Sequence, residues 1–140
     1  MLDQKTIEEV INDACVELYQ KAKCLIDDRT HERTIVADHL GPYLRGKFSG
    51  WDVNTEFNRE GKKRGPKKDL AGKVLVPDII VHKHGPDGPN LAVIQVKGYW
   101  NREPRAIDEA KLRRIQTKHG YKLLYRLELG REKHQLLQIV

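Results

Sequence analysis

Two almost uninterrupted apolar runs constrain the fold of this chain more than any other feature of its sequence. The first occupies residues 73–82 (KVLVPDIIVH) and the second residues 91–97 (LAVIQVK). Such runs predict strands that are covered on both faces, since a half-exposed strand alternates apolar and polar residues. The residues between them, 85–90 (GPDGPN), are turn formers and predict a hairpin with a long loop.

The flanking segments predict an α/β domain with the order helix, helix, three strands, helix, strand and a short terminal element. Apolar spacing indicates the helices, alternation indicates the first strand, and Thr30 is a candidate N-cap for the second helix. Gly41-Pro42 is expected to disturb that helix. The predicted ranges are helices 5–26, 30–44 and 104–118, strands 51–57, 73–82, 91–97 and 121–129, and a terminal element at 135–140.

The charge of the chain is distributed unevenly. The whole chain of 140 residues has a formal charge of +6, which fits one domain. Residues 1–28 contain seven acidic and three basic side chains, whereas residues 30–140, expected to form the core, are strongly basic. A basic body predicts a polyanionic partner such as nucleic acid, although a solvated basic surface explains the same pattern.

Several features predict a cytoplasmic protein. No segment has the run of about 18 apolar residues that a membrane span requires. Acidic residues stand near the N-terminus, where a signal peptide would carry positive charge. Cys15 and Cys24 lie on opposite faces of one predicted helix and cannot pair within it, which suits a reducing compartment. The apolar stripe of this helix is expected to face the core, and it also offers an interface for a homodimer.

Three polar residues interrupt the apolar runs and predict a site. Gln95 and Lys97 are two residues apart and therefore share a face of their strand, and Asp78 lies on the preceding strand. This arrangement suits metal-assisted phosphodiester hydrolysis. Asp78 and Gln95 would hold Mg²⁺ or Mn²⁺ through oxygen atoms, and Lys97 would act on the attacking water or the phosphate. The structural alternative is an Asp78–Lys97 ion pair.

At these residues the sequence resembles the PD-(D/E)xK nuclease superfamily, which has the restriction-endonuclease-like fold. Val-Pro-Asp78 precedes Gln95-Val96-Lys97 by sixteen residues. The resemblance is closer to small uncharacterised bacterial members with EYNR, PDIIVH and NLLVIEVKK segments, whose counterparts here are residues 56–59 (EFNR), 77–82 (PDIIVH) and 90–97 (NLAVIQVK). It implies an α-β-β-β-α-β core with a mixed central sheet flanked by helices, with the first helix as an addition.

Gln95 departs from the pattern, because the family usually has an acid at this position. An amide oxygen still contacts a hard cation but brings no charge, so metal affinity should fall. Similar Gln-x-Lys variants occur in the Mrr-like branch of the superfamily. The resemblance implies that Glu56 on the neighbouring strand supplies a missing carboxylate, and Glu32 resembles the helix acid that some of these nucleases use.

Basic side chains outside the apolar runs are candidates for phosphate contacts. Most belong to a predicted loop at residues 60–72, which carries five bases, three glycines and a proline. The candidates are Arg59, Lys62, Lys63, Arg64, Lys67, Lys68 and Lys111. Tyr99 and Trp100 follow Lys97 and are expected to cap the core, with base stacking as the alternative.

Two functions follow from these residues. The first is a metal-dependent endonuclease or exonuclease that acts on DNA, with Asp78, Gln95 and Lys97 assisted by Glu56 or Glu32. The second is a nuclease-fold protein with weak or no catalysis that binds nucleic acid or a protein partner, and Gln95 favours it.

Overall fold

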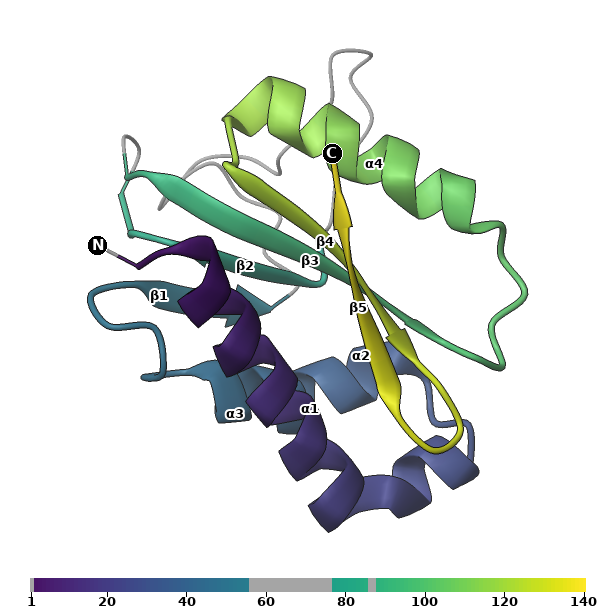
Figure 1. Ribbon diagram of the computed structural model, residues 1–140. Coiled ribbons are helices and arrows are strands. Elements are labelled where there is room, and N and C mark those ends of the chain that lie inside the picture. The colour runs from purple at the N-terminus through teal and green to yellow at the C-terminus, as the bar shows by residue number, and fades with distance from the viewer. Residues whose placement is uncertain (1, 56–76, 86–87) are drawn as a thin grey trace.

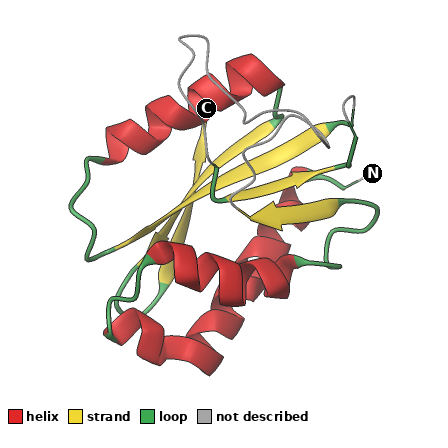
Figure 2. Cartoon of the chain, turned by 180° about the vertical axis from the view of Figure 1, so that it is seen from behind, coloured by secondary structure: helices red, strands yellow, loops and turns green. Residues whose placement is uncertain are grey.

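The computed structural model describes residues 2–55, 77–85 and 88–140. It has a mixed α/β fold in which a twisted sheet separates two sets of helices (Figures 1 and 2). The elements follow the predicted order, with an N-terminal helix added before the α-β-β-β-α-β core and a fifth strand after it. The fold class predicted from the sequence is therefore confirmed.

The bounds of the elements are close to the predicted ranges. The helices are α1 (Gln4–Asp27), α2 (Glu32–Ile35), the π-helical turn η1 (Val36–Leu40), α3 (Gly41–Leu44) and α4 (Arg105–His119). The strands are β1 (Asp52–Thr55), β2 (Ile79–His82), β3 (Asn90–Gly98), β4 (Leu123–Leu129) and β5 (His134–Ile139).

The strands lie in the sheet in the order in which they occur in the chain. β1, β2 and β3 form an antiparallel meander, and the loop between β2 and β3 closes the predicted hairpin. β4 is parallel to β3 because α4 carries the chain across the sheet between them, and β5 returns antiparallel to β4. This arrangement puts β3 in the centre, where its residues from Leu91 to Gly98 are all buried.

Helices cover both faces of the sheet, as the apolar runs predict. α1, α2, η1 and α3 pack on one face in the larger part of the core, and α4 packs on the other face against Ile80, Val93 and Leu124 (Figure 1). The stripe of α1 lies in this core, where Ile11 and Leu18 are at most 1% exposed. The stripe is therefore unavailable as a homodimer interface, and a homodimer remains a prediction that would need another surface.

The second helix is less regular than predicted, and its start differs. His31 is the N-cap residue, since its Nδ1 accepts from Arg33 N at 3.1 Å, so the choice of Thr30 is wrong. The helix widens into the π-turn just before Gly41-Pro42, where Gly41 N–H donates to Val36 O. Pro42 has no N–H to continue the α-helical pattern, which explains the irregularity.

Some predicted features lie outside the described residues. These are the basic loop 60–72, the first part of the strand predicted at 73–82, and the candidate site residues Glu56, Arg59, Lys62, Lys63, Arg64, Lys67 and Lys68. Within the described ranges, no helix combines the length and apolar character that crossing a lipid bilayer requires.

The packing of α1 leads to a stability prediction. Leu18→Ala removes a fully buried side chain, so we expect the free energy of unfolding to fall by about 3 kcal/mol in urea titrations. Val16→Ala, on the same helix at a side chain 48% exposed, is the matched control and should change it by less than about 0.5 kcal/mol. Equal effects of the two substitutions would contradict the placement of α1 in the core.

Candidate functional site

The register of the β2–β3 hairpin brings Asp78 and Gln95 together. Ile79 pairs with Ile94, so one further step along the antiparallel ladder sets Asp78 opposite Gln95. Residues opposite each other in such a ladder point to the same face of the sheet. Asp78 Oδ2 accepts from Val96 N at 2.7 Å, which fixes the carboxylate against β3.

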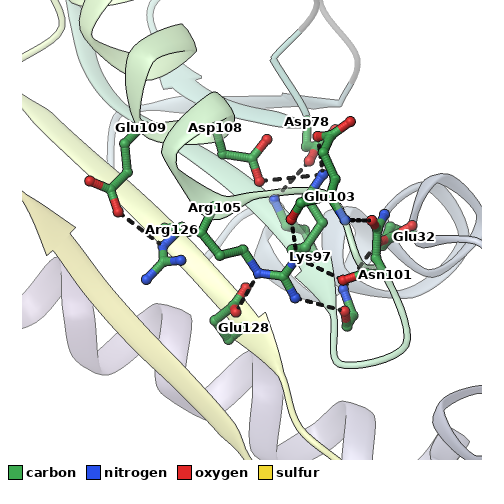
Figure 3. A network of polar contacts seen from close by, with 12 residues as sticks. Glu32, Asp78, Lys97, Asn101, Glu103, Arg105, Asp108, Glu109, Arg126 and Glu128 are labelled. Atoms are coloured by element: carbon green, nitrogen blue, oxygen red, sulfur yellow. Dashed lines mark hydrogen bonds and ion pairs between the residues drawn. The ribbon is translucent and has the colours of Figure 1, made fainter.

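A pocket of about 300 Å³ opens at this end of β3, beside α2 and the first half of α4. Figure 3 shows acidic and basic side chains from these elements and from the β3–α4 loop converging there. The pocket is lined by His31, Glu32, Arg33, Asp78, Gln95, Val96, Lys97, Asn101 and Lys111. Every candidate site residue within the described ranges therefore lines one cavity.

Burial raises the pKa of Asp78 to about 6. The Val96 N–H and the positive charges of Lys111 and Lys97 act in the opposite direction, while the negative charge of Asp108 adds to the rise. The environment therefore makes this carboxylate costly to ionise, which is typical of a group held for a function rather than for stability.

Gln95 is 5% exposed, and its Oε1 is a buried oxygen without a hydrogen-bond partner among the described residues. Buried side-chain oxygens in folded proteins usually accept a hydrogen bond, so an unpaired one calls for a bound water, ion or ligand. This oxygen is therefore available to a ligand in the pocket.

Lys97 is held by two carboxylates that were not among the predicted site residues. Its Nζ lies 2.9 Å from Glu103 Oε1 and 3.3 Å from Asp108 Oδ2 (Figure 3). Burial lowers the pKa of Lys97, but these acids outweigh that effect and the pKa lies above its usual value. Within the described residues, no ion pair joins Lys97 to Asp78, although the charge of Lys97 still acts to lower the pKa of Asp78.

Glu32 joins the helical layer to the end of β3. Its Oε2 accepts from Gly98 N at 3.0 Å and from Asn101 Nδ2 at 2.9 Å. Burial raises the pKa of Glu32, but these two hydrogen bonds outweigh it and the pKa lies below its usual value. Glu32 is thus an ionised carboxylate at the wall of the pocket, and part of its role is to hold the loop after β3.

Asp108 was not among the predicted site residues, although the helical spacing of α4 carries a signal for its burial. Asp108 is 2% exposed, whereas the apolar Ile107 beside it is 51% exposed. Asp108 stands four residues before Leu112 and seven before Ile115, so it belongs to the buried stripe. Burial raises its pKa, and the charge of Lys97 opposes the rise.

Arg105 fixes the loop that forms the far wall of the pocket. Its Nη1 donates to the carbonyl oxygens of Asn101 and Glu103, both at 2.8 Å, and its Nη2 donates to Gly98 O at 3.2 Å. Its Nε donates to Glu128 Oε1 at 2.7 Å, which anchors the arginine on β4 (Figure 3). The loop is therefore held at both ends by a single side chain.

The oxygen atoms at the pocket are the ligand type that hard divalent cations prefer. Lys111 adds a second lysine, whose pKa burial lowers while Asp78 and Asp108 counteract the effect. In the part of the chain that the structure describes, no three His, Cys, Asp or Glu side chains are grouped closely enough to form a complete metal cage.

Comparisons with known proteins do not identify this chain, since no protein-family model matches it and neither curated proteins nor solved structures contain a significant match.

The raised pKa of Asp78 leads to a prediction on stability. Its folded-state pKa of about 6 exceeds the ordinary 3.8, so the folded protein binds the proton more tightly than the unfolded chain. The carboxylate then lowers stability above about pH 6, and this cost vanishes below about pH 4. We expect Asp78→Asn to raise the free energy of unfolding by about 2 kcal/mol near neutral pH and to have little effect near pH 4.

Urea titrations across this pH range measure the difference between the two proteins. Asp13→Asn, at an exposed position on α1, is the matched control for the loss of one carboxylate. A difference for Asp78→Asn that stays constant across this pH range would contradict the prediction.

Proposed function

We propose that this protein is a divalent-metal-dependent nuclease of the PD-(D/E)xK kind that hydrolyses phosphodiester bonds of DNA in the pocket at the end of β3. The observation that carries the proposal is that Asp78, Gln95 and Lys97 line one cavity on the predicted fold. Glu32 and Lys111 line the same cavity. The sequence around these residues also resembles that superfamily.

The donor set fits Mg²⁺ or Mn²⁺. Mg²⁺ usually keeps several waters and binds through one or two carboxylates together with substrate phosphates, so it needs no complete protein cage. Asp78 and the unpaired Oε1 of Gln95 would hold it, with Glu32 assisting from α2. When bound, the ion would lower the pKa of a coordinated water and neutralise charge on the phosphate.

The lysines have an electrostatic role in this proposal. The raised pKa of Lys97 keeps its ammonium protonated at neutral pH, so it stabilises negative charge on the phosphate rather than removing a proton from water. Glu103 and Asp108 hold the ammonium at a fixed position. Lys111 provides a second positive charge on the α4 side of the pocket.

The charge of the helices supports DNA as the substrate. α4 carries five lysines and arginines against two acids, while the acidic α1 covers the opposite face of the sheet (Figure 1). DNA would therefore approach from the α4 side, where the phosphates meet positive charge. The unpaired Cys15 and Cys24 suit a cytoplasmic location, which we include in the proposal.

A second function is favoured by two observations at the same pocket. Gln95 brings no negative charge to a metal, and the ammonium of Lys97 is already neutralised by two carboxylates. Both weaken catalysis and agree with a protein of the nuclease fold that binds nucleic acid, or a protein partner, without cutting.

DNA cleavage tests the proposal. With Mn²⁺ or Mg²⁺, we expect the wild-type protein to cut plasmid or single-stranded DNA. Asp78→Asn and Lys97→Ala should each lower the rate about 100-fold or more, because each removes a group that acts on the reacting phosphate. Lys5→Gln, an exposed change on α1, which covers the opposite face of the sheet, is the matched control and should keep the activity.

Thermal melting of each variant establishes that the loss of activity is not a loss of folding. Cleavage at the same rate by wild type, Asp78→Asn and Lys97→Ala would show that a contaminating nuclease is responsible and would refute the proposal.

Restoring the acid at position 95 separates the two functions. We expect Gln95→Glu to bind Mn²⁺ about tenfold more tightly than the wild type in calorimetric titrations, because hard-cation affinity rises with the number of carboxylates. Measurable binding by both proteins would favour the nuclease. Binding by Gln95→Glu alone would show that the native site has lost its metal, and the second function would then be preferred.

A further inference from the structure

Two arginines from distant parts of the chain lie over one tyrosine ring beside the pocket. The Cζ atom of Arg29 is 6.0 Å from the ring centroid of Tyr99, and that of Arg131 is 5.5 Å from the same centroid. Arg29 lies in the connection between α1 and α2, and Arg131 lies in the turn between β4 and β5. These two connecting segments lie side by side in Figure 1. Both distances are typical of cation–π contacts, which would hold the two guanidinium groups in place.

The backbone of Arg29 adopts a conformation that favours glycine. Its φ of 54° is the only positive value of a non-glycine residue in the described ranges. Arg29 N donates to Ile26 O at 3.1 Å and Thr30 N donates to Leu25 O at 2.9 Å, which is the Schellman motif that ends a helix. Glycine is the usual residue at this position, so an arginine there costs stability and points to a use for its side chain.

The tyrosine is fixed and lies next to the candidate site. Tyr99 stands between Gly98 and Asn101, which both donate to the pocket carboxylate of Glu32. Tyr99 N also donates to Leu129 O at 2.9 Å, and the ring packs against the core. As predicted, Tyr99 caps the core, and base stacking is not needed to explain its position.

The turn that carries Arg131 is equally well anchored. Tyr19 Oη on α1 donates to Gly130 O at 2.6 Å, and Gly130 N donates to Lys133 O at 3.1 Å. Both arginines therefore extend from fixed backbone segments toward a fixed ring.

The two guanidinium groups keep their hydrogen-bond donors available. Both arginines are exposed, and among the described residues neither has a carboxylate within ion-pair distance, about 4 Å. Two acids near the arginines in sequence pair with Lys23 instead. Its Nζ lies 2.8 Å from Asp27 Oδ1 and 3.8 Å from Glu132 Oε2. Two neighbouring guanidinium groups without carboxylate partners are suited to binding phosphate groups.

We propose that Arg29 and Arg131, held over Tyr99, bind the phosphodiester backbone of the nucleic-acid strand that enters the pocket. This inference rests on the proposed function and adds to it a contact that positions the substrate strand beyond the reacting phosphate. The strand would run from the α4 side across the pocket to the side where the α1–α2 connection and the β4–β5 turn meet. Arg29 occupies a position where glycine would be more stable because it contributes this contact.

Fluorescence anisotropy with labelled single-stranded DNA tests the inference. The titrations are run in EDTA, so that no cleavage occurs, for wild type, Arg29→Gly, Arg131→Gln and the double variant. Each single change should weaken binding about fivefold near 0.1 M salt and lower the slope of log K against log salt by about 0.7. Lys5→Gln, on α1 and away from the α4 side, is the matched control for loss of one exposed positive charge.

Arg29→Gly separates binding from folding. Since glycine suits the left-handed conformation, this variant should melt at the same temperature as wild type or higher, while its DNA affinity falls. Arg29→Lys keeps the charge and should recover most of the affinity. An account in which Arg29 only stabilises the helix end predicts the reverse, with lower stability and unchanged affinity.

The remaining outcomes are decisive. If both arginine variants bind DNA with the affinity and salt slope of wild type, the inference is wrong and the pair serves another partner, such as an acidic protein surface. A wild-type protein that does not bind DNA overturns it as well. If wild type binds DNA through these arginines but does not cleave it with Mn²⁺, the inference holds and the proposed catalysis fails.

Discussion

The buried ammonium group of Lys97 is the charge on which the arrangement of this site depends. The residue lies near the end of the central strand β3, and its side chain is only 9% exposed. A buried ammonium is costly unless a carboxylate accompanies it, so the chain has to bring acids to this point. Asp108 from α4 and Glu103 from the preceding loop supply them. This pairing attaches the start of α4 to the end of β3 and closes one wall of the pocket.

Charged side chains also hold the loop between β3 and α4. Arg105 donates to three backbone carbonyls of the loop and is itself paired with Glu128 on β4. Glu32 accepts from Gly98 at the start of the loop and from Asn101 in its middle. Backbone groups that would otherwise need water are thus satisfied by charged side chains, and these hydrogen bonds are stronger than neutral ones. The result is a rigid rim around the pocket, from which Tyr99 extends toward Arg29 and Arg131.

The balance of charge in the pocket bears directly on function. Asp78 and Glu32 are the carboxylates that line it, and Lys97 and Lys111 are the lysines. Gln95 contributes an unpaired oxygen in place of a third carboxylate. A cation bound there would meet less negative charge than in a site with the usual acid, so the substrate phosphate has to contribute more of the binding. In this respect the arginine pair complements the pocket, since it would increase affinity for the phosphate chain rather than for the metal.

Much of this architecture could be predicted from the sequence because it depends on local patterns. Apolar runs, turn residues and helical spacing are properties of neighbouring residues, and they predicted the element order, the hairpin, and the common face of Gln95 and Lys97. The pattern placed Asp78 on the preceding strand, but its position opposite Gln95 depends on the register, which the structure shows to be shifted between Val81 and His82. The N-cap at His31 was missed because threonine is a common N-cap residue and histidine is not, and the His31 cap depends on a contact between its Nδ1 and Arg33 N.

The sequence by itself determined the α/β fold, the two buried strands and the polar residues placed on them. Only the tertiary structure decided which charges meet, because contacts such as Lys97 with Asp108, Glu32 with Gly98, and Arg29 with Tyr99 join residues from different elements. Their distances depend on how helices pack across the sheet, and no local pattern encodes that packing. Burial of Asp108 shows the reason, since a rotation of α4 by about 100° about its axis, the angle between adjacent residues, would have buried Ile107 instead.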